Sequence, residues 1–172
     1  YRADAKHLPF PDTCFSRVLM FDLVEHLMPW ELSQALREAH RVLEPGGRLV
    51  VHTAPNIWYD RFAYPLVRLV RRLMGQGANY PANPRAIVPV NVDVHVNEQS
   101  ALGLWWLLRR HGFRARVWLD TPPQHRREGN MLRLARRILF NWPRFSWFFE
   151  REVFAVGQKR GNLGGTPGAQ AR

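Results

Sequence analysis

The sequence has very little cysteine and lysine, and it has no long apolar run. Cys14 is the single cysteine among 172 residues, so an intramolecular disulfide is excluded, and no Cys/His cluster has the spacing of a structural zinc site. Arg, Pro or Asn interrupts every hydrophobic stretch before it reaches the roughly 18 apolar residues that span a bilayer. We therefore predict that the chain is not transmembrane, and a reducing compartment fits its cysteine content.

Acidic residues are also scarce, with 14 Asp and Glu against 25 Lys and Arg, which gives a formal charge of +11. Such an excess attracts anionic partners, which could be nucleic acid, lipid head groups or a phosphorylated substrate. Lysine occurs only as Lys6 and Lys159, so a GC-rich genome explains the arginine excess equally well. The hydrophobic content of 46% predicts one globular domain with a core and excludes a disordered chain.

The first half of the chain reads as strand, helix, strand. The apolar run at residues 15–22 indicates a buried strand, and Pro29 suits the first turn of a helix. Apolar residues then recur at helical spacing: Leu32, Ala35, Leu36, Ala39, Val42 and Leu43. Residues 44–47, Glu-Pro-Gly-Gly, end this helix, and residues 48–54 form the next strand. Short joints of this kind predict a right-handed parallel crossover and an α/β core.

The second half repeats the alternation around two insertions. We predict a helix from about residue 98 to residue 111, a strand at residues 113–120 and a final strand at about 152–158. Residues 1–159 are thus expected to form one domain, with insertions at about 57–97 and 121–150. Residues 160–172 contain one large apolar residue, Leu163, and are expected to be a disordered tail.

Four pieces of sequence, in this order, carry a resemblance to a known family. They are residues 3–12 (Ala-Asp-Ala-Lys-His-Leu-Pro-Phe-Pro-Asp), Phe15, the pair Glu25-His26, and residues 37–51, which contain Pro-Gly-Gly. The succession resembles small-molecule class I methyltransferases of the type called methyltransferase family 11. That resemblance implies S-adenosylmethionine as cofactor and a Rossmann-like sheet with helices on both faces.

The family's sheet has the strand order 3-2-1-4-5-7-6. Against that order, the chain is expected to supply family strands 4, 5, 6 and 7, and at most the end of strand 3. The family's Gly-x-Gly cofactor loop and the acid that holds the ribose would then lie upstream of Tyr1. We therefore expect an N-terminally truncated methyltransferase, inactive as it stands, whose strand 4 lacks its neighbour.

The resemblance also implies site residues. Asp4 would accept the adenine amine and Ala5 would offer its backbone N–H to the ring, while Phe21 and Asp22 would face the methionine part of the cofactor. Gly46 and Gly47 follow a helix instead of opening one, so we interpret them as structural.

The acceptor side is expected in the loops after family strands 4 and 5 and in the insertions. Glu25 and His26 are the catalytic candidates, for substrate orientation or proton transfer, although a loop histidine is often only a solvent-exposed residue. The candidates for substrate contact are Asn56, Trp58, Tyr59 and His95. Methyl transfer is an in-line displacement that needs alignment of the two reactants, and the sequence predicts no metal.

Each insertion carries a basic amphipathic helix. In the first, near residues 65–74, apolar residues oppose Arg68, Arg71 and Arg72; in the second, around residues 131–139, arginines alternate with apolar residues ahead of an aromatic cluster. Such helices suit an anionic membrane interface, which predicts a small-molecule or lipid-linked acceptor and a cytoplasmic protein peripheral to the inner face of the membrane. Equally, both helices could form a lid packed over the sheet.

Two other functional classes compete with the enzyme. The first is a non-catalytic methyltransferase-like interaction module that has lost cofactor binding. The second, an RNA-binding protein, rests on charge alone. The end of the strand at residues 15–22 lacks the acid-Pro-Pro-aromatic signature of enzymes that methylate base amines, which disfavours nucleic acid as the substrate.

Overall fold

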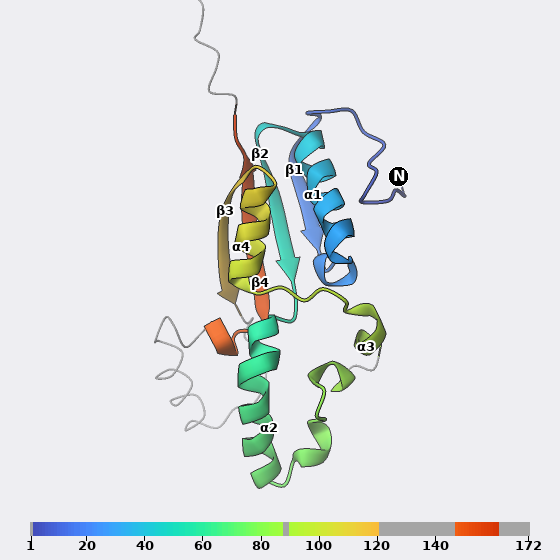
Figure 1. The fold of residues 1–172 in the computed structure, drawn as a ribbon. Helices are drawn as coiled ribbons and strands as arrows, with labels where there is room; N and C mark the ends of the chain where they lie inside the picture. The colour runs from blue at the N-terminus through green and yellow to red at the C-terminus, as the bar shows by residue number, and fades with distance from the viewer. Residues whose placement is uncertain (1, 88–89, 121–146, 162–172) are drawn as a thin grey trace, which may run out of the picture.

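The computed structural model describes residues 2–87, 90–120 and 147–161, and it shows an α/β fold (Figure 1). The strands are β1 (Phe15–Phe21), β2 (Leu43–Thr53), β3 (Phe113–Asp120) and β4 (Glu152–Lys159). The α-helices are α1 (Pro29–Val42), α2 (Tyr64–Leu73), α3 (Asn91–Val94) and α4 (Ala101–Arg110). Short 3-10 helices, η1 (Val24–His26), η3 (Gly77–Asn79) and η4 (Pro84–Ile87), and the π-helix η2 (Tyr59–Ala63) lie between them.

The four strands form one sheet in the order β1-β2-β4-β3. β1 and β2 are parallel, whereas β4 runs antiparallel to both β2 and β3. This arrangement is the order 4-5-7-6 that the resemblance implied. β1 pairs with β2 alone among the described residues, so it is an edge strand where the family's strand 1 would lie.

The turn predicted at residues 44–47 interrupts the pairing of β1 with β2. Phe15 pairs with Leu43 but Arg17 pairs with Arg48, so the register shifts across this stretch. Gly46 has a φ of 83°, which glycine adopts without strain. The strand was predicted to begin at residue 48, but β2 begins at Leu43 and includes the Pro-Gly-Gly stretch. The helix ends at Val42, close to its predicted end.

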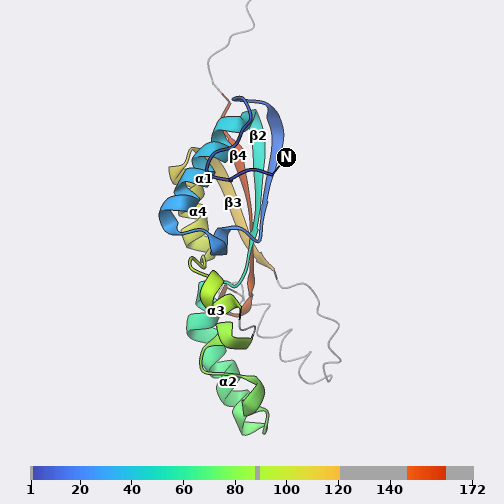
Figure 2. The ribbon, with the colours of Figure 1, turned by 90° about the vertical axis from the view of Figure 1, so that its right-hand side faces the viewer.

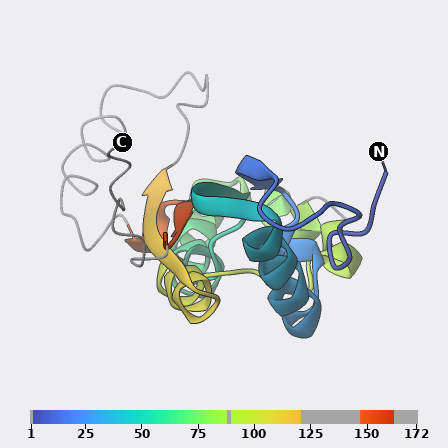
Figure 3. The same ribbon diagram turned by 90° about the horizontal axis from the view of Figure 1, so that it is seen from above.

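α1 and α4 lie on the same face of the sheet (Figures 2 and 3). The β1-α1-β2 and β2-α4-β3 connections both advance in one direction across the sheet, and right-handed crossovers in one direction place their helices on one face. The sequence predicts helices on both faces, but no helix in the described residues covers the second face. Leu19 and Phe21 are more than half exposed there.

The core lies between these two helices and the sheet. α1 contributes Leu32, Ala35, Leu36 and Ala39, and α4 contributes Leu104 and Leu108, all buried with the inward-facing strand residues. α4 begins later than predicted because the Ser100 hydroxyl accepts the backbone N–H of Gly103 (3.0 Å) and caps the helix. The helix predicted at residues 65–74 is α2, which lies beyond the end of the sheet (Figure 1).

Several predictions fall on other parts of the chain. The second insertion helix, Trp142 and Phe145 of its aromatic cluster, and the tail from residue 162 lie outside the described residues, whereas Trp147, Phe148 and Phe149 are described. Within the described ranges, no helix is both long and apolar enough to cross a membrane.

Gly112 joins α4 to β3 with a φ of 88°, and a Cβ added there would lie 3.0 Å from Nε2 of His40. Gly46 has a similar φ but nothing within 4 Å of such an atom. We expect Gly46→Ala to lower the free energy of unfolding by about 1–2 kcal/mol, the cost of left-handed backbone, and Gly112→Ala to lower it further. Urea denaturation measures both losses, and equal losses would contradict the steric role of His40.

Candidate functional site

The candidate site lies where β1 and β2 end. Carboxyl ends of parallel strands meet at one edge of a sheet, and ligands of open α/β sheets bind there. η1 follows β1 directly, and residues 54–56 follow β2. The segment after α3 joins them, because the Glu25 carbonyl accepts the backbone N–H groups of Val96 (2.9 Å) and Asn97 (3.1 Å).

Glu25 is the most deeply buried acid at this edge, with 3% of its surface exposed. Its Oε2 accepts a hydrogen bond from the Thr53 hydroxyl at 2.7 Å, and Thr53 is fully buried at the end of β2. This hydrogen bond fixes the orientation of the carboxylate between the two strand ends.

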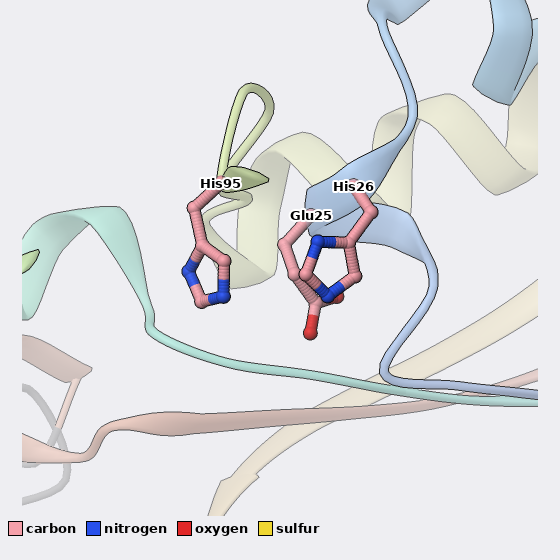
Figure 4. A group of neighbouring side chains, drawn as sticks. All are labelled: Glu25, His26 and His95. Atoms are coloured by element: carbon pink, nitrogen blue, oxygen red, sulfur yellow. The ribbon is translucent and has the colours of Figure 1, made fainter. Parts of the chain in front are cut away.

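His26 and His95 face the same carboxylate (Figure 4). Their rings pack edge to face with centroids 5.0 Å apart. Nδ1 of His26 lies 3.1 Å from the Val94 carbonyl, which can only accept a hydrogen bond. His95 is 9% exposed, and its Nδ1 lies 3.8 Å from Oε1 of Glu98 without a hydrogen-bond partner. The structure thus brings the two catalytic candidates together with one of the four substrate candidates.

These three residues also form the one group of metal-ligand type found in the described ranges. One ligand atom from each of Glu25, His26 and His95 lies within 4.8 Å of the others. The sequence predicts no metal, because methyl transfer by displacement needs none. His95 is far from the other two residues along the chain, and the segment that follows it is joined to Glu25 by the hydrogen bonds from Val96 and Asn97.

The proposed adenine-binding residues lie beside the first turn of α1. Oδ1 of Asp4 accepts the backbone N–H of Lys6 (2.9 Å), and the Lys6 ammonium binds Glu31 in that turn (2.7 Å). Asp4 is exposed, and Ala5 packs against the core. Asp4 forms an isolated bridge with His7 instead of ending a sheet strand, so the expected remnant of family strand 3 is not part of the sheet.

Asp22 adopts a left-handed φ of 49° at the end of β1. Its carboxylate lies 2.8 Å from Nδ1 of His52, and Nε2 of the same ring lies 3.3 Å from Glu152. No role was predicted for His52 from the sequence. Aligning the two predicted strands in parallel would have placed His52 opposite Phe21, beside Asp22, as the structure does.

Asn56 is fully buried. Its amide donates to the carbonyls of Trp147 (2.9 Å) and Glu150 (3.0 Å) and accepts from the backbone of Trp58 (3.2 Å). All of its polar side-chain atoms are therefore used in joining the two insertions, and it presents no surface to a substrate.

Trp58 and Tyr59 belong to an aromatic cluster beside Asn56. Trp58 stacks on Trp147 and Phe148, with centroids 5.9 and 5.5 Å apart. The guanidinium of Arg151 lies 5.2 Å from the centre of the Tyr59 ring. The structure thus places these two candidates in the packing between the insertions. They follow Thr53, which contacts Glu25, by only a few residues, but they belong to a separate cluster.

A second group of charges, which the sequence did not single out, lies behind His95. Arg85 donates to both carboxylate oxygens of Glu98 (2.8 and 3.0 Å), which is 8% exposed. Burial, followed by the charge of Glu98, raises the pKa of Asp60 to about 6. Asp60 lies in η2, and π-helical turns are frequent at functional sites.

The raised pKa of Asp60 predicts a pH-dependent stability. Its ordinary pKa is 3.8, so between about pH 4 and 6 the folded protein holds this proton more tightly than the unfolded chain. The free energy of unfolding therefore falls as the pH rises through that window. We expect the free energy of unfolding of Asp60→Asn, relative to that of the parent, to rise by about 1 kcal/mol between about pH 4 and pH 6.5. This is less than the full pKa shift implies, because the carboxyl group is partly exposed. Urea denaturation at both pH values tests this, and a constant difference would contradict it.

The comparisons with known proteins agree with this geometry. The family model described as a methyltransferase domain matches residues 1–51. Over these residues the chain is similar to this methyltransferase family. It is similar to the ubiquinone/menaquinone biosynthesis C-methyltransferase UbiE of Laribacter hongkongensis, with 34% identity over 83 residues, which are 45% of this chain and 33% of that protein.

A second relative, from Mycolicibacterium smegmatis, is named among the S-adenosylmethionine-dependent methyltransferases. It is 32% identical over 117 residues, which are 65% of this chain and 35% of that protein. The chain thus spans about a third of the length of these curated relatives.

Solved structures share the fold. A chain from the complex of the Haloferax volcanii Trm112 methyltransferase activator with a methyltransferase is 13% identical, with a TM-score of 0.56 over 92% of this chain and 60% of that one. A SAM-dependent methyltransferase from Archaeoglobus fulgidus is 16% identical, with a TM-score of 0.52 over 92% of this chain and 66% of that one. At this identity the likeness shows the Rossmann-like methyltransferase fold alone.

Proposed function

We propose that this protein transfers a methyl group from S-adenosylmethionine to a small-molecule acceptor. One observation carries the proposal: the methyltransferase strand order, with β4 reversed, brings the loops after β1 and β2 to one edge. The residues of the family match and the buried Glu25 meet at that edge. Residues 1–159 are then a portion of one methyltransferase domain that includes both insertions.

The cofactor side is formed by the segment before β1 and by the end of β1. The exposed Asp4 carboxylate is free of the sheet and suits the adenine amine, with the backbone of Ala5 beside it. The left-handed turn at Asp22 places that residue and Phe21 at the strand end, where the methionine part is proposed to lie.

The acceptor side is formed by η1 and the residue 95–98 segment. Glu25 and His26 lie next to His95, so an acceptor at this point would meet one carboxylate and two imidazoles that can orient it and take its proton. Trp58 and Tyr59 border this side through the aromatic cluster that Asn56 supports.

The cofactor proposal predicts that the full-length protein binds S-adenosylhomocysteine and transfers labelled methyl groups from S-adenosylmethionine to an acceptor. Asp4→Ala removes one charge-assisted hydrogen bond of about 1.5–3 kcal/mol, so affinity for S-adenosylhomocysteine should fall about 10- to 100-fold in calorimetry.

Asp12→Ala is the matched control, because Asp12 is an exposed carboxylate of the same segment that pairs with Arg41 instead (2.8 Å). It should leave the affinity unchanged. Absence of binding by the parent protein would overturn the enzymatic proposal in favour of a non-catalytic interaction module.

We further propose that the acceptor is amphipathic or lipid-linked and that α2 approaches an anionic membrane. The apolar residues of α2 face outward: Leu66, Leu69 and Val70 are about half exposed, and Leu73 is 80% exposed. The arginine side is the one that packs, since Arg68 donates to the Tyr80 carbonyl (3.1 Å). A relative named for ubiquinone and menaquinone biosynthesis supports an acceptor of this chemistry.

The exposed apolar residues of α2 argue against the alternative in which this helix forms a lid packed over the sheet. Among the described elements α2 contacts η2 and η3, which precede and follow it. A lid would turn its apolar residues onto the sheet, whereas these residues point away from the described elements.

Vesicle flotation tests the membrane proposal. The protein should float with phosphatidylglycerol-containing vesicles and less with neutral ones, and Leu73→Asp should weaken partitioning about tenfold or more, since a buried leucine contributes about 1.5–3 kcal/mol. Leu102→Asp, on the exposed side of α4, is the control and should have little effect. The proposal fails if the parent binds neither type of vesicle.

A further inference from the structure

We propose that Glu25, His26 and His95 form a binding site for one divalent transition-metal ion of the zinc class. Two imidazoles and one carboxylate are ligands that such ions accept, and three protein ligands leave a position open for water or substrate. The sequence predicted no metal, and the site goes beyond the proposed methyl transfer, because binding of the ion can be measured without it.

The ligand atoms are close to coordination distance. They lie within 4.8 Å of one another, whereas tetrahedral zinc with bonds of about 2.0–2.1 Å sets its ligands about 3.3 Å apart. Binding of the ion would therefore draw the three side chains closer together. Figure 4 shows a ring nitrogen of each histidine turned toward the Glu25 carboxylate.

Each ligand is also oriented by a second contact, as in metal sites generally. Thr53 holds Oε2 of Glu25 at 2.7 Å, which leaves Oε1 for an ion. Nδ1 of His26 donates to the Val94 carbonyl (3.1 Å), which leaves the lone pair of Nε2 in the neutral ring.

His95 supplies the observation that most directly indicates a ligand. The residue is 9% exposed, and its Nδ1 has no hydrogen-bond partner but lies 3.8 Å from Oε1 of Glu98. Arg85 holds that carboxylate in place. A proton on Nδ1 would face Glu98 and direct Nε2 to the ion, which is the carboxylate–histidine–metal arrangement of many zinc sites.

The remaining charges suit a cation. Two negative charges, those of Glu25 and Glu98, lie in buried surroundings, and Arg85 neutralises the one that is not a ligand. A buried carboxylate without a counter-charge is costly, so a divalent ion at Glu25 would stabilise the fold and bring the ends of β1 and α3 together.

Metal titration of the untagged full-length protein, first stripped with chelator, tests the site. We expect one equivalent of Zn(II) to bind in calorimetry and to raise the melting temperature, and Co(II) to give the visible absorption of a four-coordinate complex. His95→Ala and Glu25→Gln should each weaken Zn(II) binding by more than 10-fold, and Glu98→Gln by about 10- to 100-fold.

His7→Ala, which removes an exposed histidine outside the site, should not change the affinity. Circular dichroism of each metal-free variant separates a lost site from a lost fold. The proposal is overturned if the parent binds no stoichiometric Zn(II), or if folded His95→Ala binds it as tightly as the parent. Neither result touches the methyl-transfer proposal, which S-adenosylhomocysteine binding tests separately.

Discussion

The buried carboxylate of Glu25 is the constraint on which the candidate site depends. A carboxylate that loses water must recover hydrogen bonds or a counter-charge, or its burial destabilises the fold. Here the Thr53 hydroxyl donates one hydrogen bond to the carboxylate of Glu25. Separately, the backbone carbonyl of Glu25 accepts hydrogen bonds from the backbone N–H groups of Val96 and Asn97. One residue therefore joins the end of β1, the end of β2 and the first insertion, and these three segments form the candidate site.

The sheet topology explains why that junction lies where a ligand can reach it. Right-handed crossovers put α1 and α4 on one face, and they leave the carboxyl ends of β1 and β2 side by side at the edge from which the insertions depart. β1 is an edge strand of the described sheet, on the side where the family's strand 1 would pair. Asp4 and Asp22 are the residues proposed for the cofactor, and Glu25, His26 and His95, which lie together, are those proposed for the acceptor.

The regular elements could be predicted from the sequence because each one rests on a local pattern. The apolar spacing of α1, the alternation in β3 and the Pro-Gly-Gly stop are all contained in short windows, and the structure reproduces them within a few residues. The site could be predicted only in part. Glu25 and His26 followed from a continuous motif, whereas the approach of His95 to these two residues and the contact of Asp22 with His52 join residues far apart in the sequence. Asn56 shows the opposite difficulty: a polar residue after a strand suggests substrate contact, yet its amide is consumed by backbone groups about ninety residues away.

The family match ends at residue 51, and this limit separates the residues proposed for the cofactor from most of those proposed for the acceptor. Residues 1–51 contain Asp4, Asp22, Glu25 and His26, which are the parts proposed to hold the cofactor and to reach the reacting atom. Every other residue on the acceptor side comes from later segments: the aromatic cluster of Trp58 and Trp147, the Arg85–Glu98 pair and His95. Methyl transfer from a common cofactor imposes the same geometry on every member of such a family, but each acceptor needs its own pocket. We therefore propose that the insertions determine the acceptor; the hydrogen bonds of Glu25 and Asn56 join them to the ends of the strands.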